Sequence, residues 1–236
     1  MIASLLVFVT IVALALPAAV VLIPFTLLTG NVGPLFAVGS WISRVAIRVA
    51  GIHLSIEGRE NLPPGRACIF MANHLSNLDA PALIANLPSR TVVFLKRPLM
   101  TIPILGYAFK LASFIPVDRD GTVEGAQLAV EQAQRVLASG LHITAFVEGM
   151  RSPDGRMLPF KKGTFYLAKD SGAPCIPVSI YGSEKILPVN SKRIHPGAMH
   201  IVFHPPIDPA HYATRDDLSE AVRAAIASGL PEWMRG

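Results

Sequence analysis

The stretch ACIFMANHLSNLDAPAL, residues 67–83, joins an apolar run to a polar turn and then to the start of a helix. The run ACIFM does not alternate with polar residues, which is typical of a strand buried on both faces of a sheet. Pro81 is tolerated only near the first turn of a helix, because deeper inside it would remove a backbone hydrogen bond. The helix is therefore predicted to begin close to residues 77–79, which places His74 in a turn between strand and helix.

Short apolar runs of the same kind recur along the chain, at residues 52–56, 91–95, 113–117, 142–147, 175–181 and 199–203. Helical patterns lie between some of them. One follows Thr122 and stops at Gly140, and another starts at Thr214, where Asp217 completes a capping box. Strands that alternate with helices predict the α/β class, with a mostly parallel or mixed central sheet flanked by helices. We expect residues 51–236 to form this one domain.

The N-terminal region, residues 1–50, differs from the rest of the chain because no Asp, Glu, Lys or Arg precedes Arg44. Residues 1–29 exceed the roughly 20 apolar residues that cross a bilayer core. Pro17 and Pro24 interrupt helices, and a second apolar stretch follows, so a kinked span or a half-buried helical pair fits better than a simple anchor, and we predict a membrane-associated helical pair. Whether this pair spans the bilayer, re-enters it or lies along it stays open.

A cleaved secretory signal is the alternative interpretation of the N-terminal region. The start of the chain carries no Lys or Arg and its apolar run is long, which disfavours a signal peptide. Arg44, Arg48 and Arg59 lie just after the most apolar residues and favour a body on the cytoplasmic side. We therefore expect the protein at the cytoplasmic face of the inner (plasma) membrane.

The net charge of +5 and the isoelectric point near 9.5 suit an anionic membrane surface or a phosphate-bearing substrate. No Lys- or Arg-rich run alternates with aromatic residues, so no nucleic acid partner is predicted. The sequence also has no Gly-rich phosphate loop, no Cys-His zinc spacing and no nucleophile elbow. We predict that the protein needs neither a metal nor a cofactor, and that Cys68 and Cys175 are buried free thiols.

His74 and Asp79 are the first candidate catalytic pair. The histidine lies in the turn and the aspartate at the helix start. The carboxylate can therefore hold one imidazole nitrogen while the other is free to accept a proton. The alternative is that Asp79 only caps the helix and that His74 is an exposed loop residue. The spacing alone leaves both interpretations open.

Charged residues follow two further predicted strands. In FIPVDRDG, Arg119 presents a planar fork that suits phosphate, unless it pairs with a neighbouring aspartate at the surface. In AFVEGMRS, Glu148, Gly149 and Arg151 combine an acid, a glycine that permits close backbone approach and a base. The alternative there is a turn with an ion pair. Two strand ends that each present an arginine favour an anion-binding pocket.

Four patterns in chain order resemble the glycerolipid acyltransferases of the 1-acyl-glycerol-3-phosphate acyltransferase type. Asn73, His74 and Asp79 match the family pattern N-H-x-x-x-x-D. SFIPVDRD is similar to the second family block, FVEGMRS to the F-P-E-G-T-R-S block, and IPVSIYG to the fourth block. The resemblance covers residues 52 to about 190. It implies a helical pair against the membrane and the transfer of an acyl group from a thioester to a lysolipid hydroxyl.

The resemblance implies that His74 is the general base and that Asp79 orients it. The base would deprotonate the 2-hydroxyl of lysophosphatidic acid as that oxygen attacks an acyl thioester of acyl carrier protein or acyl-CoA, which gives phosphatidic acid. General-base assistance of this kind contributes about 10² to 10⁴ in rate. The resemblance thus predicts an acyltransferase of phospholipid biosynthesis.

The resemblance also implies roles for the residues of the anion pocket. Arg119 and Arg151 would bind the acceptor's phosphate, and Glu148 with Gly149 would position its glycerol part. Lys96 in FLKRPL is similar to the lysine of the family's K-x-E-L pattern and would add a third positive contact.

The chain departs from the family pattern at Val147, Met150 and Pro98, which border the expected acceptor pocket. Two alternative functions therefore stay open. The same reaction could use a different acceptor, such as a lyso-ornithine lipid, another lysophospholipid or a glycolipid. The chain could also be a non-catalytic, membrane-associated lipid-binding protein that kept the fold.

Overall fold

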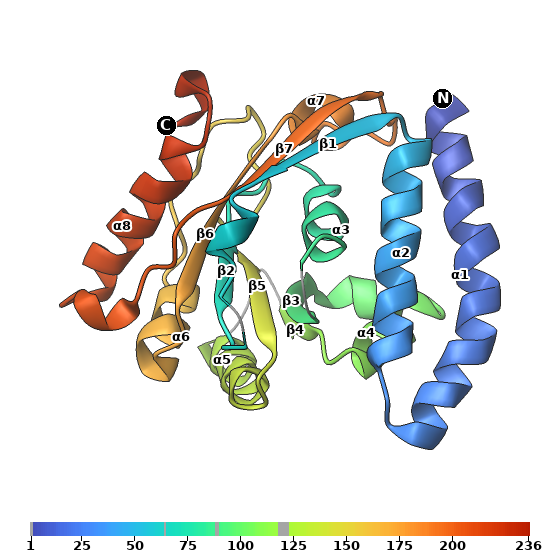
Figure 1. Cartoon of the computed structure of the whole chain (residues 1–236), viewed down its shortest axis with the longest axis horizontal. Coiled ribbons are helices and arrows are strands. Elements are labelled where there is room, and N and C mark those ends of the chain that lie inside the picture. The colour runs from blue at the N-terminus through green and yellow to red at the C-terminus, as the bar shows by residue number, and fades with distance from the viewer. Residues whose placement is uncertain (1, 64, 88–89, 118–122) are drawn as a thin grey trace.

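The computed structural model describes residues 2–63, 65–87, 90–117 and 123–236. In this part of the chain, a seven-stranded sheet forms the middle layer, in the order β1-β7-β6-β2-β5-β3-β4 (Figure 1). Its strands are β1 (Ile52–Glu57), β2 (Ile69–Ala72), β3 (Thr91–Lys96), β4 (Ile115–Val117), β5 (His142–Phe146), β6 (Cys175–Tyr181) and β7 (Gly197–Phe203). Neighbouring strands are parallel except β6 and β7, so the predicted mixed sheet is confirmed.

Helices cover both faces of this sheet. One face packs against α5 (Val123–Ala138), α6 (Gly163–Ser171) and α8 (Arg215–Ser228). The other face packs against α2 (Gly33–Val49), α3 (Asp79–Ile84) and α7 (Ser183–Ile186), with α1 (Ile2–Thr29) beside α2 and α4 (Leu105–Leu111) in contact with α1. The described chain also forms the short 3₁₀ helices η1 (Arg59–Asn61), η2 (Arg97–Thr101), η3 (Pro209–His211) and η4 (Glu232–Met234).

Strand β2 is buried on both faces, as its apolar run predicts. Ile69 and Met71 point into the core beneath α5, α6 and α8, whereas Phe70 and Ala72 point into the core beneath α2 and α3. None of the four is more than 1% exposed. Because complete burial of a large apolar side chain stabilises the fold by roughly 1.5–3 kcal/mol, this central strand anchors both cores.

The two predicted helices are confirmed at the ends that the structure describes. At the start of α8, Thr214 Oγ1 accepts a hydrogen bond from the Asp217 N–H at 3.1 Å, and Asp217 Oδ2 accepts one from the Thr214 N–H at 3.0 Å. Helix α5 ends at Ala138, just before Gly140. The cap predicted at Thr122 lies outside the described residues.

The connections that leave β2 and β5 determine where a site can form. β2 leads through α3 to β3 on one side of the sheet, whereas β5 leads through α6 to β6 on the other side. The two strands are neighbours, and the helices that follow them cover opposite faces. In open α/β sheets the carboxyl ends of two such strands border a crevice where ligands bind.

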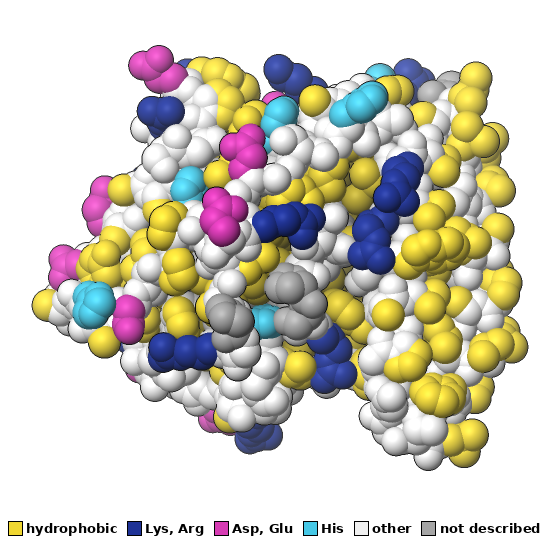
Figure 2. Space-filling view, viewed as in Figure 1, with side chains coloured by type: hydrophobic (Ala, Val, Ile, Leu, Met, Phe, Trp, Pro, Cys, Tyr) yellow, Lys and Arg dark blue, Asp and Glu magenta, His cyan; other side chains and the backbone are white. Residues whose placement is uncertain are grey.

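The predicted N-terminal helical pair is present, with α1 and α2 packed side by side (Figure 1). With 28 residues, α1 is about 42 Å long. Among the described residues it is the one helix long and apolar enough to cross a membrane, and many of its apolar side chains are exposed (Figure 2). The prediction that Pro17 and Pro24 interrupt this helix was wrong, because each removes only one backbone hydrogen bond and the turns on either side continue.

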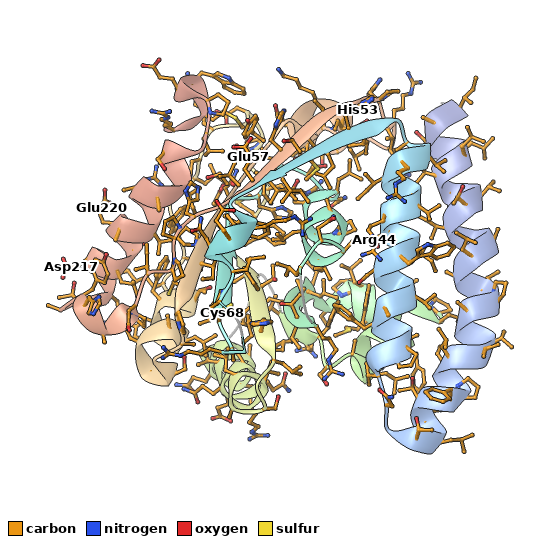
Figure 3. The ribbon with its side chains drawn as sticks, viewed as in Figure 1. Arg44, His53, Glu57, Cys68, Asp217 and Glu220 are labelled. Carbon is orange, nitrogen blue, oxygen red and sulfur yellow. The ribbon has the colours of Figure 1, made fainter. Side chains whose placement is uncertain are left out.

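Two hydrogen bonds fasten the helical pair to the body. From α2, Arg44 Nη1 donates to the carbonyl oxygen of Ala85 at the end of α3, at 2.5 Å (Figure 3). From the loop before β7, the Ile194 N–H donates to Ser4 Oγ of α1 at 2.9 Å. Although α2 ends just before β1 begins, the division into regions 1–50 and 51–236 stays a prediction.

Both cysteines are free and fully buried, as predicted. Burial raises the pKa of the Cys68 and Cys175 thiols to about 12. Since the thiolate is the reactive form, neither side chain is expected to react with thiol reagents in the folded protein near neutral pH.

The end of β1 approaches the end of β7 too closely for a side chain. Gly58 has a φ of 72°, and a Cβ atom built on it would overlap the carbonyl oxygen of Phe203. The same oxygen accepts a hydrogen bond from Asn61 Nδ2 at 2.8 Å. Gly65 has the same φ, but nothing lies within 4 Å of a Cβ built there. The two glycines therefore share a backbone conformation and differ in available space.

Alanine substitutions at these glycines separate the two effects. We expect Gly65→Ala to lower the free energy of unfolding by about 1–2 kcal/mol, because an L residue is strained in the left-handed region. Gly58→Ala should cost about 1–3 kcal/mol more, because the two chain segments must also move apart. Chemical unfolding of the detergent-solubilised variants measures both losses. Equal losses would contradict the importance of the close approach to Phe203.

Candidate active site

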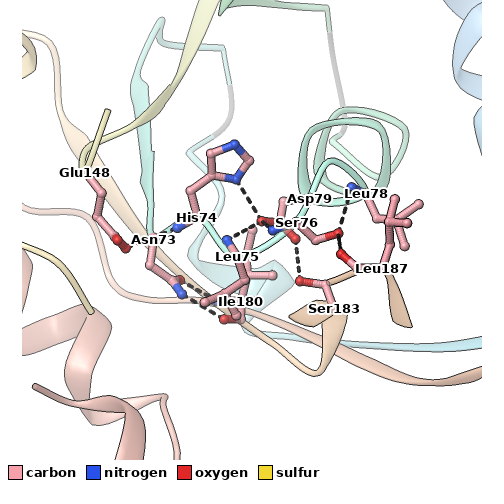
Figure 4. A network of polar contacts seen from close by, with 10 residues as sticks. All are labelled: Asn73, His74, Leu75, Ser76, Leu78, Asp79, Glu148, Ile180, Ser183 and Leu187. Carbon is pink, nitrogen blue, oxygen red and sulfur yellow. Dashed lines mark hydrogen bonds and ion pairs between the residues drawn. The ribbon is translucent and has the colours of Figure 1, made fainter. Parts of the chain in front are cut away.

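The site begins where the side chain of Asn73 prolongs the pairing of β2 with β6. Asn73 Nδ2 donates to the carbonyl oxygen of Ile180 at 2.8 Å, and its Oδ1 accepts from the Ile180 N–H at 2.8 Å (Figure 4). A side-chain amide thus satisfies two buried backbone groups at the end of β2. This bridge fixes the point where the backbone leaves the sheet, and therefore the position of His74.

Asp79, the first residue of α3, accepts several hydrogen bonds from the turn that precedes it. Its Oδ2 atom lies 2.8 Å from His74 Nδ1 and accepts the N–H groups of Leu75 at 2.7 Å and Ser76 at 2.8 Å. Its Oδ1 atom accepts from Ser183 Oγ at 2.5 Å, at the start of α7 (Figure 4). The side chain is completely buried. Four donors therefore compensate for the cost of burying this carboxylate.

The His74 ring is held on two sides. Asp79 fixes Nδ1, and the ring stacks on Phe146 at the end of β5, with 4.0 Å between centroids and an interplanar angle of 23°. With the Nδ1 proton shared with a carboxylate, the neutral ring carries its lone pair on Nε2. Nε2 has no hydrogen-bond partner among the described residues, and the 17% exposed side chain lines the main cavity. His74 is thus oriented and open to accept a proton.

Glu148 lies behind the turn rather than in the cavity wall. Its Oε1 accepts the His74 N–H and its Oε2 accepts the Leu158 N–H, both at 3.1 Å. The side chain is 1% exposed. Burial raises the pKa of Glu148 to about 7, although the two backbone hydrogen bonds lower it, and the nearby charge of Asp79 adds a smaller increase. This carboxyl group holds the backbone of the turn that carries His74.

The loop after β5 folds back onto the turn that carries His74. The Ser152 N–H donates to the His74 carbonyl oxygen at 2.8 Å, and the Lys161 N–H donates to the Val147 carbonyl oxygen at 2.7 Å. Gly149 has a φ of 72°, and a Cβ built there would lie 3.0 Å from Lys161 Cγ. Its lack of a side chain lets Lys161 pass close to the end of β5.

The cavity beside His74 has a volume of about 1240 Å³. This exceeds the roughly 300–1,000 Å³ of ordinary small-molecule pockets. Most of its lining residues are apolar and many of them come from α1, α2, α3 and α4, while its cationic side chains are Lys96, Arg97, Arg151 and Lys161. Within the described part of the chain, the side chains of Arg151 and Lys161 have no hydrogen-bond or ion-pair partner. The cavity therefore suits a long apolar molecule with an anionic group near His74.

The structure brings most of the predicted site residues together. His74, Lys96, Gly149 and Arg151 line the cavity, while Asp79 and Glu148 stand behind His74. Arg119 lies outside the described residues. Within those residues, no group of three or more His, Cys, Asp or Glu lies close enough to hold a metal ion.

Sequence reasoning missed the contribution of Ser183, and it noted Lys161 after the Glu148 block without assigning it a role. Ser183 follows the fourth family-like block directly, so a search for polar residues after each strand could have found it. Lys161 follows Glu148 by thirteen positions. It lines the cavity only because the loop after β5 folds back.

Comparison with known proteins identifies the relatives of this chain. The model of the family described as acyltransferase matches residues 53–181, more than half of the chain. The chain is 32% identical to 1-acyl-sn-glycerol-3-phosphate acyltransferase alpha of Homo sapiens over 77% of this chain and 65% of that protein. It is 30% identical to the 1-acyl-sn-glycerol-3-phosphate acyltransferase of Limnanthes douglasii over 90% of this chain and 75% of that protein. The chain thus spans about two thirds to three quarters of the length of these relatives.

A solved structure shares the fold. It is the crystal structure of the 1-acyl-sn-glycerophosphate (LPA) acyltransferase, PlsC, from Thermotoga maritima. The TM-score is 0.86, the match covers 98% of this chain and 95% of that chain, and the sequences are 24% identical. The likeness includes nearly the whole chain, so it extends to the N-terminal helices.

The buried position of Glu148 makes its contribution to stability depend on pH. Its pKa rises from 4.5 to about 7 on folding, so the folded protein keeps this proton at pH values where the unfolded chain has lost it. The contribution of Glu148 to the free energy of unfolding is therefore largest below about pH 4.5 and is lost as the pH rises toward 7. Glu148→Gln removes this titration. The free energy of unfolding of the variant should therefore increase relative to that of the wild type as the pH rises from about 4.5 to 7.

Urea unfolding of wild type and Glu148→Gln at several pH values measures the shift. Glu60→Gln, at an exposed glutamate, controls for the loss of one carboxyl group. A difference between wild type and Glu148→Gln that stays constant from pH 5 to pH 7 would contradict the raised pKa.

Proposed function

This chain belongs to the acyltransferase family, and from that premise we propose that it transfers an acyl group from a thioester to the 2-hydroxyl of lysophosphatidic acid, giving phosphatidic acid. The observation that carries the proposal is the placement of His74. His74 lines a cavity whose wall is mostly apolar and also carries cationic side chains, among them Arg151, whose neighbour Ser152 donates to the His74 carbonyl oxygen. A lysophosphatidic acid molecule has the matching parts, an acyl chain and a phosphate on either side of a free hydroxyl.

In the proposed reaction, His74 Nε2 takes the proton of the acceptor hydroxyl as its oxygen attacks the thioester carbonyl carbon. The tetrahedral intermediate then collapses, the carbon–sulfur bond breaks, and the departing thiolate takes the proton from the imidazolium. The Asp79 carboxylate, 2.8 Å from Nδ1, stabilises the imidazolium that forms between these steps. A thioester is already activated, so the chemistry asks the protein for one base and correct positioning.

Asp79 and Glu148 act in this proposal through His74 rather than on the substrate. Asp79 fixes the ring, and Glu148 holds the backbone N–H of the same residue. Because both Glu148 oxygens accept main-chain N–H groups, the geometry favours this positioning role over the glycerol contact implied by the family resemblance. Gly149 stays a candidate for the glycerol contact, because it lines the cavity.

The acceptor's phosphate is proposed to bind among the cations of the cavity. The side chains of Arg151 and Lys161 have no hydrogen-bond or ion-pair partner among the described residues, and a guanidinium group offers paired donors to phosphate oxygens. Lys96 lines the same cavity from the end of β3. Arg119 stays a proposed phosphate contact from its position in the second family-like block.

The membrane is the proposed source of the acceptor. The exposed apolar α1 supports membrane association, and the Arg residues that follow it support a body on the cytoplasmic face of the inner membrane. Acyl carrier protein or acyl-CoA is the proposed donor, since both carry acyl thioesters and negative charge that complements the net charge of +5.

A different lysolipid acceptor is the second candidate function. Val147, one of the departures from the family pattern, lines the cavity. The chemistry at His74 would be the same, but an acceptor without phosphate would not need Arg151.

His74→Ala tests the proposed base. We expect thiol release from acyl-CoA or acyl carrier protein to require lysophosphatidic acid in the wild type and to fall by about 10² to 10⁴ in the variant. Release is measured with a thiol reagent and detergent-purified protein, whose own cysteines are buried. If wild type consumes no thioester with any lysolipid, the enzyme proposal is wrong and a lipid-binding role is favoured.

Arg151→Ala tests the proposed phosphate contact. The loss of a charge-assisted hydrogen bond should raise KM for lysophosphatidic acid about 10- to 100-fold. Arg156→Ala provides the matched control, because Arg156 is an exposed arginine of the same loop that does not line the cavity. An unchanged KM in Arg151→Ala, together with faster turnover of an uncharged lysolipid, would point to the second candidate function.

A further inference from the structure

The segment of residues 97–107, which contains η2 and the start of α4, exposes an unusual number of large apolar side chains. Leu99, Ile102, Ile104, Leu105 and Tyr107 are each 36–45% exposed. Isolated apolar residues are normal on a protein surface, but a contiguous group of this size marks an interaction site.

The 97–107 segment is apolar on its inner side as well. Leu99, Pro103, Ile104 and Leu105 contribute to the cavity that holds His74, whereas Ile102 and Tyr107 do not line it. The segment therefore forms part of the cavity wall and also places the exposed side chains of Ile102 and Tyr107 outside the cavity.

The backbone of this wall is held in an uncommon conformation. Ile104 has a φ of 65°, which is rare for a β-branched residue. At Gly106, a Cβ would overlap the carbonyl oxygen of Met100, so α4 folds tightly back on η2. A strained, tightly folded turn that presents apolar side chains outward is consistent with a surface shaped for contact.

The sequence around this segment carries no acidic side chain. None of the chain's 16 Asp and Glu residues lies within residues 1–56 or within residues 80–117. Both stretches nevertheless contain cations, which are Arg44 and Arg48 in the first and Arg90, Lys96, Arg97 and Lys110 in the second. Apolar side chains combined with cations and no acids complement an anionic phospholipid surface.

The 97–107 segment is also continuous with the N-terminal helices, because α4 packs against α1. The α1 helix exposes apolar side chains along its length, including Leu5, Phe8, Val20 and Leu28. In Figure 2, apolar side chains cover the edge of the molecule formed by α1. A single bilayer surface can therefore contact both elements.

We propose that the 97–107 segment is a second membrane-contacting surface that inserts Ile102, Tyr107 and their apolar neighbours into the lipid interface beside α1. The cavity with His74 then lies between two elements that both touch lipid, so an acyl chain can pass from the bilayer into it without crossing water. The inference uses the proposed function only in taking the membrane as the source of the acceptor.

Single-cysteine labelling tests the contact directly. Ile102→Cys, Leu28→Cys on α1 and Leu128→Cys on α5 are introduced into the full chain, whose own cysteines are buried. Each carries an environment-sensitive fluorophore and is reconstituted into vesicles of neutral and anionic phospholipid that contain spin-labelled lipid. We expect probes at positions 28 and 102 to shift to the blue and to be quenched by the labelled lipid. The probe at position 128, 59% exposed in the native chain, should stay unquenched.

Each other outcome overturns the inference. If position 102 behaves like position 128, the segment faces water. If neither position 28 nor position 102 is quenched, the protein does not contact lipid in this way. A blue shift at position 102 without lipid that grows with protein concentration would assign the surface to a second copy of the chain. None of these readings requires turnover, so failure of the proposed reaction is recognised separately.

A kinetic comparison adds a second measurement. Ile102→Glu and Tyr107→Glu leave the cavity wall unchanged but place charge at the proposed interface. We expect at least a tenfold loss of rate with acceptor embedded in vesicles and less than a twofold change with a monomeric short-chain acceptor. Leu128→Glu should change neither rate. Equal losses with both acceptors would contradict a membrane contact.

Discussion

The structure of the candidate site depends on one buried carboxylate, that of Asp79. It joins the ring of His74, two N–H groups of the same turn and the hydroxyl of Ser183, so it ties the end of β2 to α3 and to the element that follows β6. An unpaired charge at this depth would be strongly destabilising, and four donors remove that cost. The hydrogen bonds that compensate for burying this charge also fix the orientation of the His74 ring. The same contacts therefore serve the stability of the fold and the proposed chemistry.

The sheet explains why these groups meet. Neighbouring strands β2 and β5 send their connections to opposite faces, which leaves space at their carboxyl ends. The turn after β2 supplies His74 and the loop after β5 supplies Glu148 and Arg151. Buried carboxyl groups lie on the protein side of His74, and cations lie on the cavity side. The histidine therefore stands between the groups that position it and an apolar cavity that carries cationic side chains.

Local patterns were sufficient to predict the strands, the capping box of α8 and the turn that carries His74, because short-range geometry decides those features. The pair His74 and Asp79 lies within one turn, so its contact could be expected from spacing. Contacts between distant segments could not. The bond from Ser183 to Asp79 spans 104 residues, and the second bond to Glu148 comes from Leu158 after a loop returns. Likewise, α1 continues through Pro17 and Pro24, although the local rule for proline predicts an interruption there.

The edge position of β1 has a consequence for the order in which the protein can assemble. Among the described residues its partner strand in the sheet is β7, and α1, at the start of the chain, is fastened through Ser4 to Ile194. The first elements to leave the ribosome, α1 and β1, therefore complete their docking only after β7 and the loop before it have been synthesised. The helical pair α1 and α2 can form early, since its contacts are mutual and local. A nascent chain would therefore present this helical pair to a membrane well before the turn that carries His74 has formed.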